Sequence, residues 1–181
     1  MLLPFLAIVS GWKSGTFLRN STFKNAGAGT LLGLVYFGVI FSFLYFLPDL
    51  LSIDFDSIKT KAETFHISTP TSFLCWGLIF SIFHSLFEEF YWHWFLFGSL
   101  TNFVTKQTAI LLAGAAFSLH HIIALLSFTT PSLAIFIGLL VGVIGSFWCY
   151  LYVKQKNILS AWISHIFADL AIVFVTYSIL F

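Results

Sequence analysis

The stretch His84-Ser85-Leu86-Phe87-Glu88-Glu89-Phe90-Tyr91-Trp92-His93 decides how this sequence is expected to fold. It places two adjacent glutamates in an apolar, aromatic segment, residues 71–100, which contains no other Asp, Glu, Lys or Arg. A helix needs about 20 residues to cross a bilayer, so this segment is long enough. An ionised carboxylate in the middle of a membrane helix costs about 3 kcal/mol, and two neighbouring ones repel each other. The pair therefore indicates a functional site inside a membrane span. The alternative is that the pair lies at the end of a helix, where both glutamates reach water.

The composition is that of an integral membrane protein. The 181 residues are 59% hydrophobic and only 8% charged, whereas soluble domains contain about 25% charged residues. The mean hydropathy is +0.99. The net charge of +1 gives no reason to expect a nucleic-acid partner, and the sequence leaves the oligomeric state open.

Five segments are apolar and long enough to span a bilayer, which predicts an all-α, polytopic transmembrane bundle. The predicted spans are residues 30–47, 71–100, 108–128, 132–153 and 158–181. Residues 1–9 are apolar but too short to span, so we expect a partial span, an interfacial helix or a re-entrant piece there.

The basic residues predict how these spans are oriented. Six of the eight Lys and Arg residues fall in three loops that successive spans place on one side, which the positive-inside rule assigns to the cytoplasm. These loops are residues 11–29, the loop with Lys106, and the loop with Lys154 and Lys156. The acidic stretch, residues 49–70, and the turn at residues 129–131 then lie outside.

The ionisable groups within the spans agree in depth. Glu88 and His121 each lie about a dozen residues from the cytoplasmic end of their spans, and His165 and Asp169 lie slightly closer to that side. At 1.5 Å per residue these depths are about 10–20 Å. Because unrelated structural polar residues would not be expected to share one depth, we predict a single polar site, open toward the cytoplasm, built from three spans.

Helical spacing indicates which of these side chains share a face. His84 and Glu88 are four residues apart, as are Glu89 and His93. Because Glu88 and Glu89 differ by about 100° around a helix axis, one is expected to face the site while His93 or a backbone donor holds the other. Elsewhere, four-residue spacing pairs Phe117 with His121 and His165 with Asp169.

Three motifs in this order resemble a known family. The first is Glu88-Glu89-Phe90-Tyr91-Trp92-His93, in which His93 stands where the family has an arginine; the second is Phe117-Ser118-Leu119-His120-His121; the third is His165-Ile166-Phe167-Ala168-Asp169. Over residues 71–181 the sequence resembles the CAAX protease and bacteriocin-processing (CPBP or Abi) family of intramembrane glutamate endopeptidases. The resemblance implies one membrane domain, in which residues 71–181 form a protease-like core that follows an N-terminal segment, the first span and an extracytoplasmic loop in residues 1–70.

The resemblance also implies roles for the motif residues. Glu88 would be the general base that activates water, and His121 would help to hold that water. His165 and Asp169 would stabilise the oxyanion, although an ionised Asp169 cannot donate a hydrogen bond, so we expect it to orient His165 instead. Glu89 would brace the site through His93, which is shorter than the family's arginine.

The family further implies a location and a reaction. We expect a multi-pass protein of the cytoplasmic membrane of a prokaryote, which hydrolyses a membrane-associated, lipidated or small peptide without a cofactor. Zinc is the alternative cofactor, because His and carboxylate groups bind it, but no His-Glu-x-x-His motif is present. An inactive membrane scaffold, a bacteriocin-immunity factor and a proton-coupled transporter stay open as alternatives. For His84 and His120 an interhelical hydrogen bond is the expected role.

Overall fold

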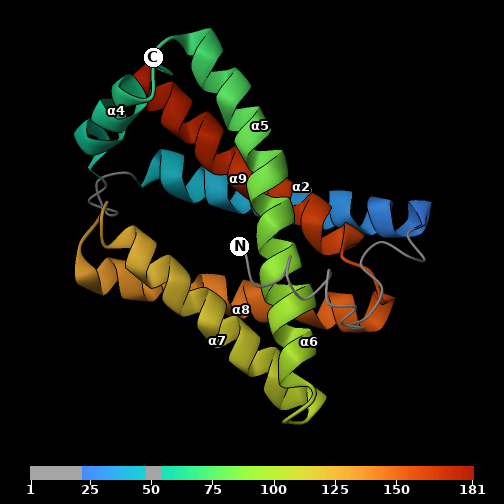
Figure 1. The fold of residues 1–181 in the computed structure, drawn as a ribbon. Helices are drawn as coiled ribbons and strands as arrows, with labels where there is room; N and C mark the ends of the chain where they lie inside the picture. The colour runs from blue at the N-terminus through green and yellow to red at the C-terminus, as the bar shows by residue number, and fades with distance from the viewer. Residues whose placement is uncertain (1–21, 48–53) are drawn as a thin grey trace.

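The structure, a computed structural model, describes residues 22–47 and 54–181 (Figure 1). Residues 1–9, for which a short membrane segment is predicted, lie outside the described residues. Within the described ranges there is no strand, and five helices are long and apolar enough to cross a membrane. This confirms the predicted all-α fold with five spans. The helices are α2 (Phe23–Phe46), α4 (Phe55–Thr64), α5 (Pro70–Glu88), the π-helix η1 (Glu89–Leu96), α6 (Phe97–Leu100), α7 (Lys106–Leu125), α8 (Pro131–Gln155) and α9 (Leu159–Leu180).

Hydrogen-bonding caps set where two of these helices begin. Thr69 caps α5 through the backbone N–H of Ser72, and Pro70 occupies the first turn, where its missing N–H costs nothing. Thr22 caps α2 in the same way through Asn25, so the first span begins seven residues before the predicted residue 30. The prediction that residues 11–29 form a loop is therefore wrong from residue 23 onward.

The acidic stretch is also more ordered than predicted, because it contains the helix α4. Asp54 accepts a hydrogen bond from the backbone N–H of Ser57 and so caps this helix. The backbone N–H of Asp54 donates to the carbonyl of Phe128 over 3.0 Å, and the Lys61 ammonium lies 3.8 Å from the centre of the Phe128 ring. These contacts place the acidic stretch beside the turn between α7 and α8, on one side of the protein, as expected; which side faces the cytoplasm stays a prediction.

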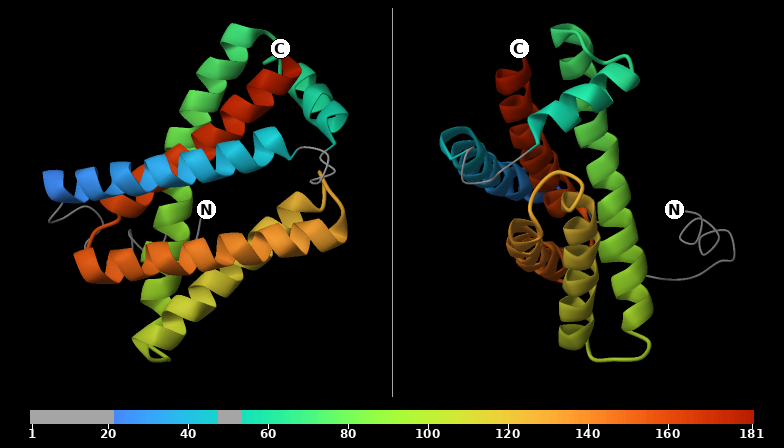
Figure 2. Two further views of the ribbon diagram at one scale, coloured as in Figure 1. Left: turned by 180° about the vertical axis from the view of Figure 1, so that it is seen from behind. Right: turned by 90° about the vertical axis from the view of Figure 1, so that its left-hand side faces the viewer.

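Two helix pairs and one long helix make up the bundle (Figures 1 and 2). Helix α2 packs along α9, and α7 packs along α8. The continuous helix α5–η1–α6 crosses both pairs: α5 contacts α9, η1 contacts α7 and α8, and α6 contacts α7. The junction of α5 and η1, where Glu88 and Glu89 lie, therefore falls where the two pairs meet.

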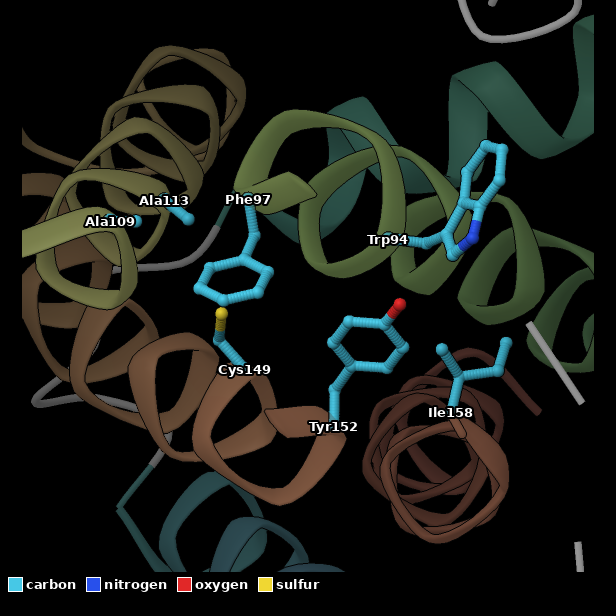
Figure 3. Close-up of a cluster of buried hydrophobic side chains, with 7 residues drawn as sticks. All are labelled: Trp94, Phe97, Ala109, Ala113, Cys149, Tyr152 and Ile158. Atoms are coloured by element: carbon cyan, nitrogen blue, oxygen red, sulfur yellow. The ribbon is translucent and has the colours of Figure 1, made fainter. Parts of the chain in front are cut away.

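A buried apolar cluster joins η1, α6, α7 and α8 with Ile158, the residue before α9 (Figure 3). Val104, in the loop after α6, and Val153, near the end of α8, are partly buried and pack against it. Lys106, which the structure places at the start of α7 rather than in a loop, and Lys156, at the end of α8, therefore lie near one cluster, as their predicted placement on one side requires. The cluster consists of Trp94, Phe97, Ala109, Ala113, Cys149, Tyr152 and Ile158.

Candidate active site

The carboxylate of Glu88 lies inside a group of four histidines from three helices. Glu88 is 4% exposed, and each of its oxygens faces two imidazoles. Oε1 lies 3.5 Å from His84 Nε2 and 3.2 Å from His120 Nε2. Oε2 lies 3.9 Å from His121 Nε2 and 3.6 Å from His165 Nε2. Intramembrane residues more than 70 positions apart in the sequence thus meet at one carboxylate.

The two oxygens of Glu88 differ in their surroundings. The histidines on the Oε1 side are accessible, with His84 and His120 side chains 32% and 49% exposed. Oε2 is buried and, among the described residues, accepts no hydrogen bond. A buried carboxylate oxygen without a donor is costly, so this atom is suited to a bound water, substrate or ion.

Glu89 is fully buried and has a different role in the geometry. Its Oε2 accepts a hydrogen bond from His93 Nδ1 at 2.7 Å, and its Oε1 accepts one from His165 Nδ1 at 3.0 Å. The expected pairing of Glu89 with His93 is therefore present. The second bond was not expected: Glu89 fixes the ring of His165 so that its Nε2 is directed toward Glu88.

The two glutamates are separated by a change of helix type. Helix α5 ends at Glu88, and the π-helix η1 begins at Glu89. Short π-helical segments are rare and often occur at functional sites. The side chains of Glu89, His93 and Trp94 are all buried on η1, so the wider turn directs this segment into the bundle. The sequence predicted an ordinary α-helix here.

An aromatic wall holds the deeper histidines in place. Trp148 of α8 stacks on His165 with ring centroids 4.2 Å apart and planes 20° apart, and its Nε1 donates to Ser164 Oγ at 2.9 Å. Phe117 is fully buried and lies 4.3 Å from the His121 ring. The backbone carbonyl of Phe117 also receives the Nδ1 hydrogen bond of His121 at 3.1 Å, so Nε2 of His121 is left facing Glu88.

The structure thus brings together the predicted residues Glu88, Glu89, His93, Phe117, His121, His165 and Asp169. The hydrogen bond by which Asp169 was expected to orient His165 is not formed. Asp169 Oδ1 lies 3.7 Å from His165 Nε2, too far for a hydrogen bond. Glu89 holds Nδ1 of His165 instead, and Asp169 Oδ2 lies 3.3 Å from His84 Nδ1.

Sequence reasoning missed three contributors to this site. His84 and His120 were expected to form hydrogen bonds between helices; His84 does so with Asp169, but both also contact Glu88, which was not expected. The four-residue spacing of His84 and Glu88 was the available signal for the first. Trp148 lies in a span without charged groups near it in sequence, so no pattern marked it.

Among the residues that the structure describes, two groups of three side chains could hold a metal ion. They are His84 with Glu88 and His165, and Glu88 with His120 and His121. In each group the three ligand atoms lie within 4.8 Å of one another.

The fold and site define a polytopic helical membrane protein with a buried glutamate–histidine centre. The family described as type II CAAX prenyl endopeptidase Rce1-like matches residues 70–171, more than half of the chain. The chain belongs to this family, as its three motifs indicated. No curated protein and no solved structure matches it. Family membership implies a protease, and the five apolar helices together with the family indicate an integral, multi-pass membrane protein.

Proposed function

We propose that the chain is an intramembrane endopeptidase in which Glu88 activates a water molecule for attack on a peptide bond. The observation that carries the proposal is the buried Oε2 of Glu88, which accepts no hydrogen bond among the described residues while two imidazole nitrogens face it. The proposed substrate is a membrane-associated or small peptide. Because the family is described as one of prenyl endopeptidases, a prenylated peptide is the first substrate to test.

The first step concerns the water. Glu88 Oε2 and His121 Nε2 are 3.9 Å apart, which is too long for a direct hydrogen bond and short enough for one water to donate to both. The bond from His121 Nδ1 to the Phe117 carbonyl leaves the Nε2 lone pair free to accept. A water held in this way keeps its oxygen lone pairs available for attack.

The remaining steps complete the hydrolysis. As the water oxygen bonds to the carbonyl carbon, one of its protons passes to Glu88. With its Nδ1 bonded to the Glu89 carboxylate, His165 can carry a second proton at Nε2 and donate it as a hydrogen bond to the oxyanion. The C–N bond then breaks, and Glu88 returns its proton to the leaving amine. The products are a carboxylic acid and an amine.

The test is Glu88→Gln in the purified full chain with a fluorescent, prenylated peptide. This change keeps the shape of the side chain but removes the proton acceptor, so kcat/KM should fall roughly 10²- to 10⁴-fold. Glu63→Gln, on the exposed surface of α4, is the matched control and should retain activity. Undiminished cleavage by Glu88→Gln would contradict the proposal.

Two further measurements address the alternatives. If an inactive scaffold or immunity factor is the correct function, the wild-type chain should cleave none of the prenylated, unmodified or sorting-signal peptides, and Glu88→Gln should leave the cellular phenotype unchanged. If the protein is a zinc protease, EDTA or phenanthroline should abolish cleavage and added zinc should restore it. Under the proposed mechanism both chelators leave cleavage intact.

A further inference from the structure

Two histidines beside Glu88 have one ring nitrogen held by a carboxylate. Nδ1 of His165 lies 3.0 Å from Glu89 Oε1, and Nδ1 of His84 lies 3.3 Å from Asp169 Oδ2. An ionised carboxylate only accepts hydrogen bonds, so each Nδ1 carries the proton. In a neutral imidazole the Nε2 then has a free lone pair. Histidines that bind metal ions nearly always show this arrangement, in which a carboxylate or carbonyl accepts the other N–H.

The two free nitrogens face the same third group. His84 Nε2 lies 3.5 Å from Glu88 Oε1, and His165 Nε2 lies 3.6 Å from Glu88 Oε2. In a tetrahedral zinc site, with metal–ligand bonds of about 2.0–2.2 Å, neighbouring ligand atoms are roughly 3.4 Å apart. These two distances end on different oxygens of Glu88, but one ligand atom from each of the three side chains lies within 4.8 Å of the others, so small side-chain movements would bring them to this spacing. An ion bound through Oε2 of Glu88 would supply the partner that this oxygen lacks among the described residues.

We propose that His84, Glu88 and His165 bind one divalent transition-metal ion, of which Zn²⁺ is the representative, and that the bound ion inhibits the peptidase. The inhibitory part rests on the proposed role of Glu88 as general base. A carboxylate that coordinates an ion no longer accepts a proton from water. Metalloproteases use a separate carboxylate for this step, but here both oxygens of Glu89 accept hydrogen bonds from histidines, and Asp169 is bonded to the ligand His84.

The second candidate group, Glu88 with His120 and His121, is the alternative location for the ion. In that group the Nδ1 of His121 is held by a backbone carbonyl rather than by a carboxylate, and the His120 side chain is about half exposed. A carboxylate partner raises the basicity of a ligand imidazole, so the group with His84 and His165 is favoured.

The chain offers a matched pair of variants. His84 and His120 both place Nε2 close to Glu88 Oε1, at 3.5 and 3.2 Å, and both are partly exposed. His84→Gln removes a ligand of the proposed site, whereas His120→Gln removes a neighbour of Glu88 outside it. Co²⁺ is the probe, because it replaces zinc and gives a visible absorption band when four-coordinate; the detergent-solubilised full chain should carry no polyhistidine tag.

We expect wild type to bind one equivalent of Co²⁺, displaced by Zn²⁺. His84→Gln should raise the Kd for Co²⁺ at least roughly 10-fold, and His120→Gln should change it less than 3-fold. Even the loss of a residue that only supports a metal ligand typically lowers metal affinity roughly 10- to 100-fold. Asp169→Ala keeps all three ligands but removes the carboxylate that holds His84, so it should weaken Co²⁺ binding roughly 10- to 100-fold. This variant replaces His84→Gln in the test if His84→Gln does not fold.

Peptidase assays with Zn²⁺ test the inhibitory part, each variant being compared with its own metal-free rate. The concentration for half-inhibition should rise with the Kd in His84→Gln and stay close to wild type in His120→Gln. Absence of Co²⁺ binding by wild type, or loss of binding in His120→Gln alone, would overturn the proposed site. Stimulation by Zn²⁺ would overturn the inhibitory role. Metal binding is read without substrate, so a failure of the peptidase proposal leaves this test interpretable.

Discussion

Glu89→Gln isolates the contribution of the second glutamate. Glu89 is fully buried and accepts one hydrogen bond at each oxygen, from His93 at 2.7 Å and from His165 at 3.0 Å. Glutamine keeps one acceptor and turns the other into an NH₂ donor, so one imidazole N–H loses its partner. A hydrogen bond to a charged group contributes about 1.5–3 kcal/mol. At 1.4 kcal/mol per factor of ten, kcat should fall roughly 10- to 150-fold.

The assay is steady-state cleavage of the same prenylated peptide by wild type, Glu89→Gln, His165→Ala and the double variant. We expect KM to change little, because Glu89 lies behind His165 rather than at the accessible side of Glu88. If Glu89 acts through His165, adding Glu89→Gln to His165→Ala should reduce kcat less than 3-fold, since residues that act as a unit are not additive. A further 10-fold fall in that background, or an unchanged rate in a folded Glu89→Gln variant, would refute this reasoning.

Three other outcomes follow from the packing and topology. Trp148→Leu removes a ring stack on His165 worth about 0.5–1.5 kcal/mol, so kcat/KM should fall roughly 2- to 10-fold while Trp148→Phe retains most activity. Gly142→Ala should lower the free energy of unfolding by about 1–3 kcal/mol in a thermal melt, because its Cβ would lie 2.6 Å from a side-chain carbon of α7, whereas Gly38→Ala, with nothing within 4 Å, should be neutral. A cysteine at Lys154 should react with a membrane-impermeant thiol reagent only from the cytoplasmic side, and labelling from outside would reverse the predicted orientation.

The spans were predictable because hydropathy and length almost determine a membrane helix. The residues at which the spans begin were less predictable. The cap at Thr22 depends on reciprocal hydrogen bonds with Asn25, and α2 therefore extends into residues 23–29, which were predicted to be a loop. Helix α4 was not predicted. It has a local cap, Asp54, but Asp54 and Lys61 also contact Phe128, a residue more than 60 positions away, which no local pattern indicates.

The candidate site was predictable only in part. Depth and four-residue spacing correctly brought Glu88, His121 and His165 together, but they did not give the partners of each ring. Whether His165 bonds to Glu89 or Asp169 depends on the crossing of α9 with the long helix and on the π-helical turn at η1. The spacing of residues along the sequence predicts neither feature. The roles of these residues in catalysis stay predictions.

The π-helix also makes the number of residues between Glu88 and Phe97 a property that matters in its own right. A π-helical turn holds more residues than an α-helical turn. Deleting one residue within η1 would therefore allow the segment to close as an ordinary α-helix and leave Phe97 near Tyr152, whose ring centroid lies 6.0 Å from its own. A deletion between Glu89 and His93 would instead reduce their spacing from four residues to three, which turns one by about 100° relative to the other. A change of length here would therefore act on the pairing of Glu89 with His93 while the helix on either side keeps its place.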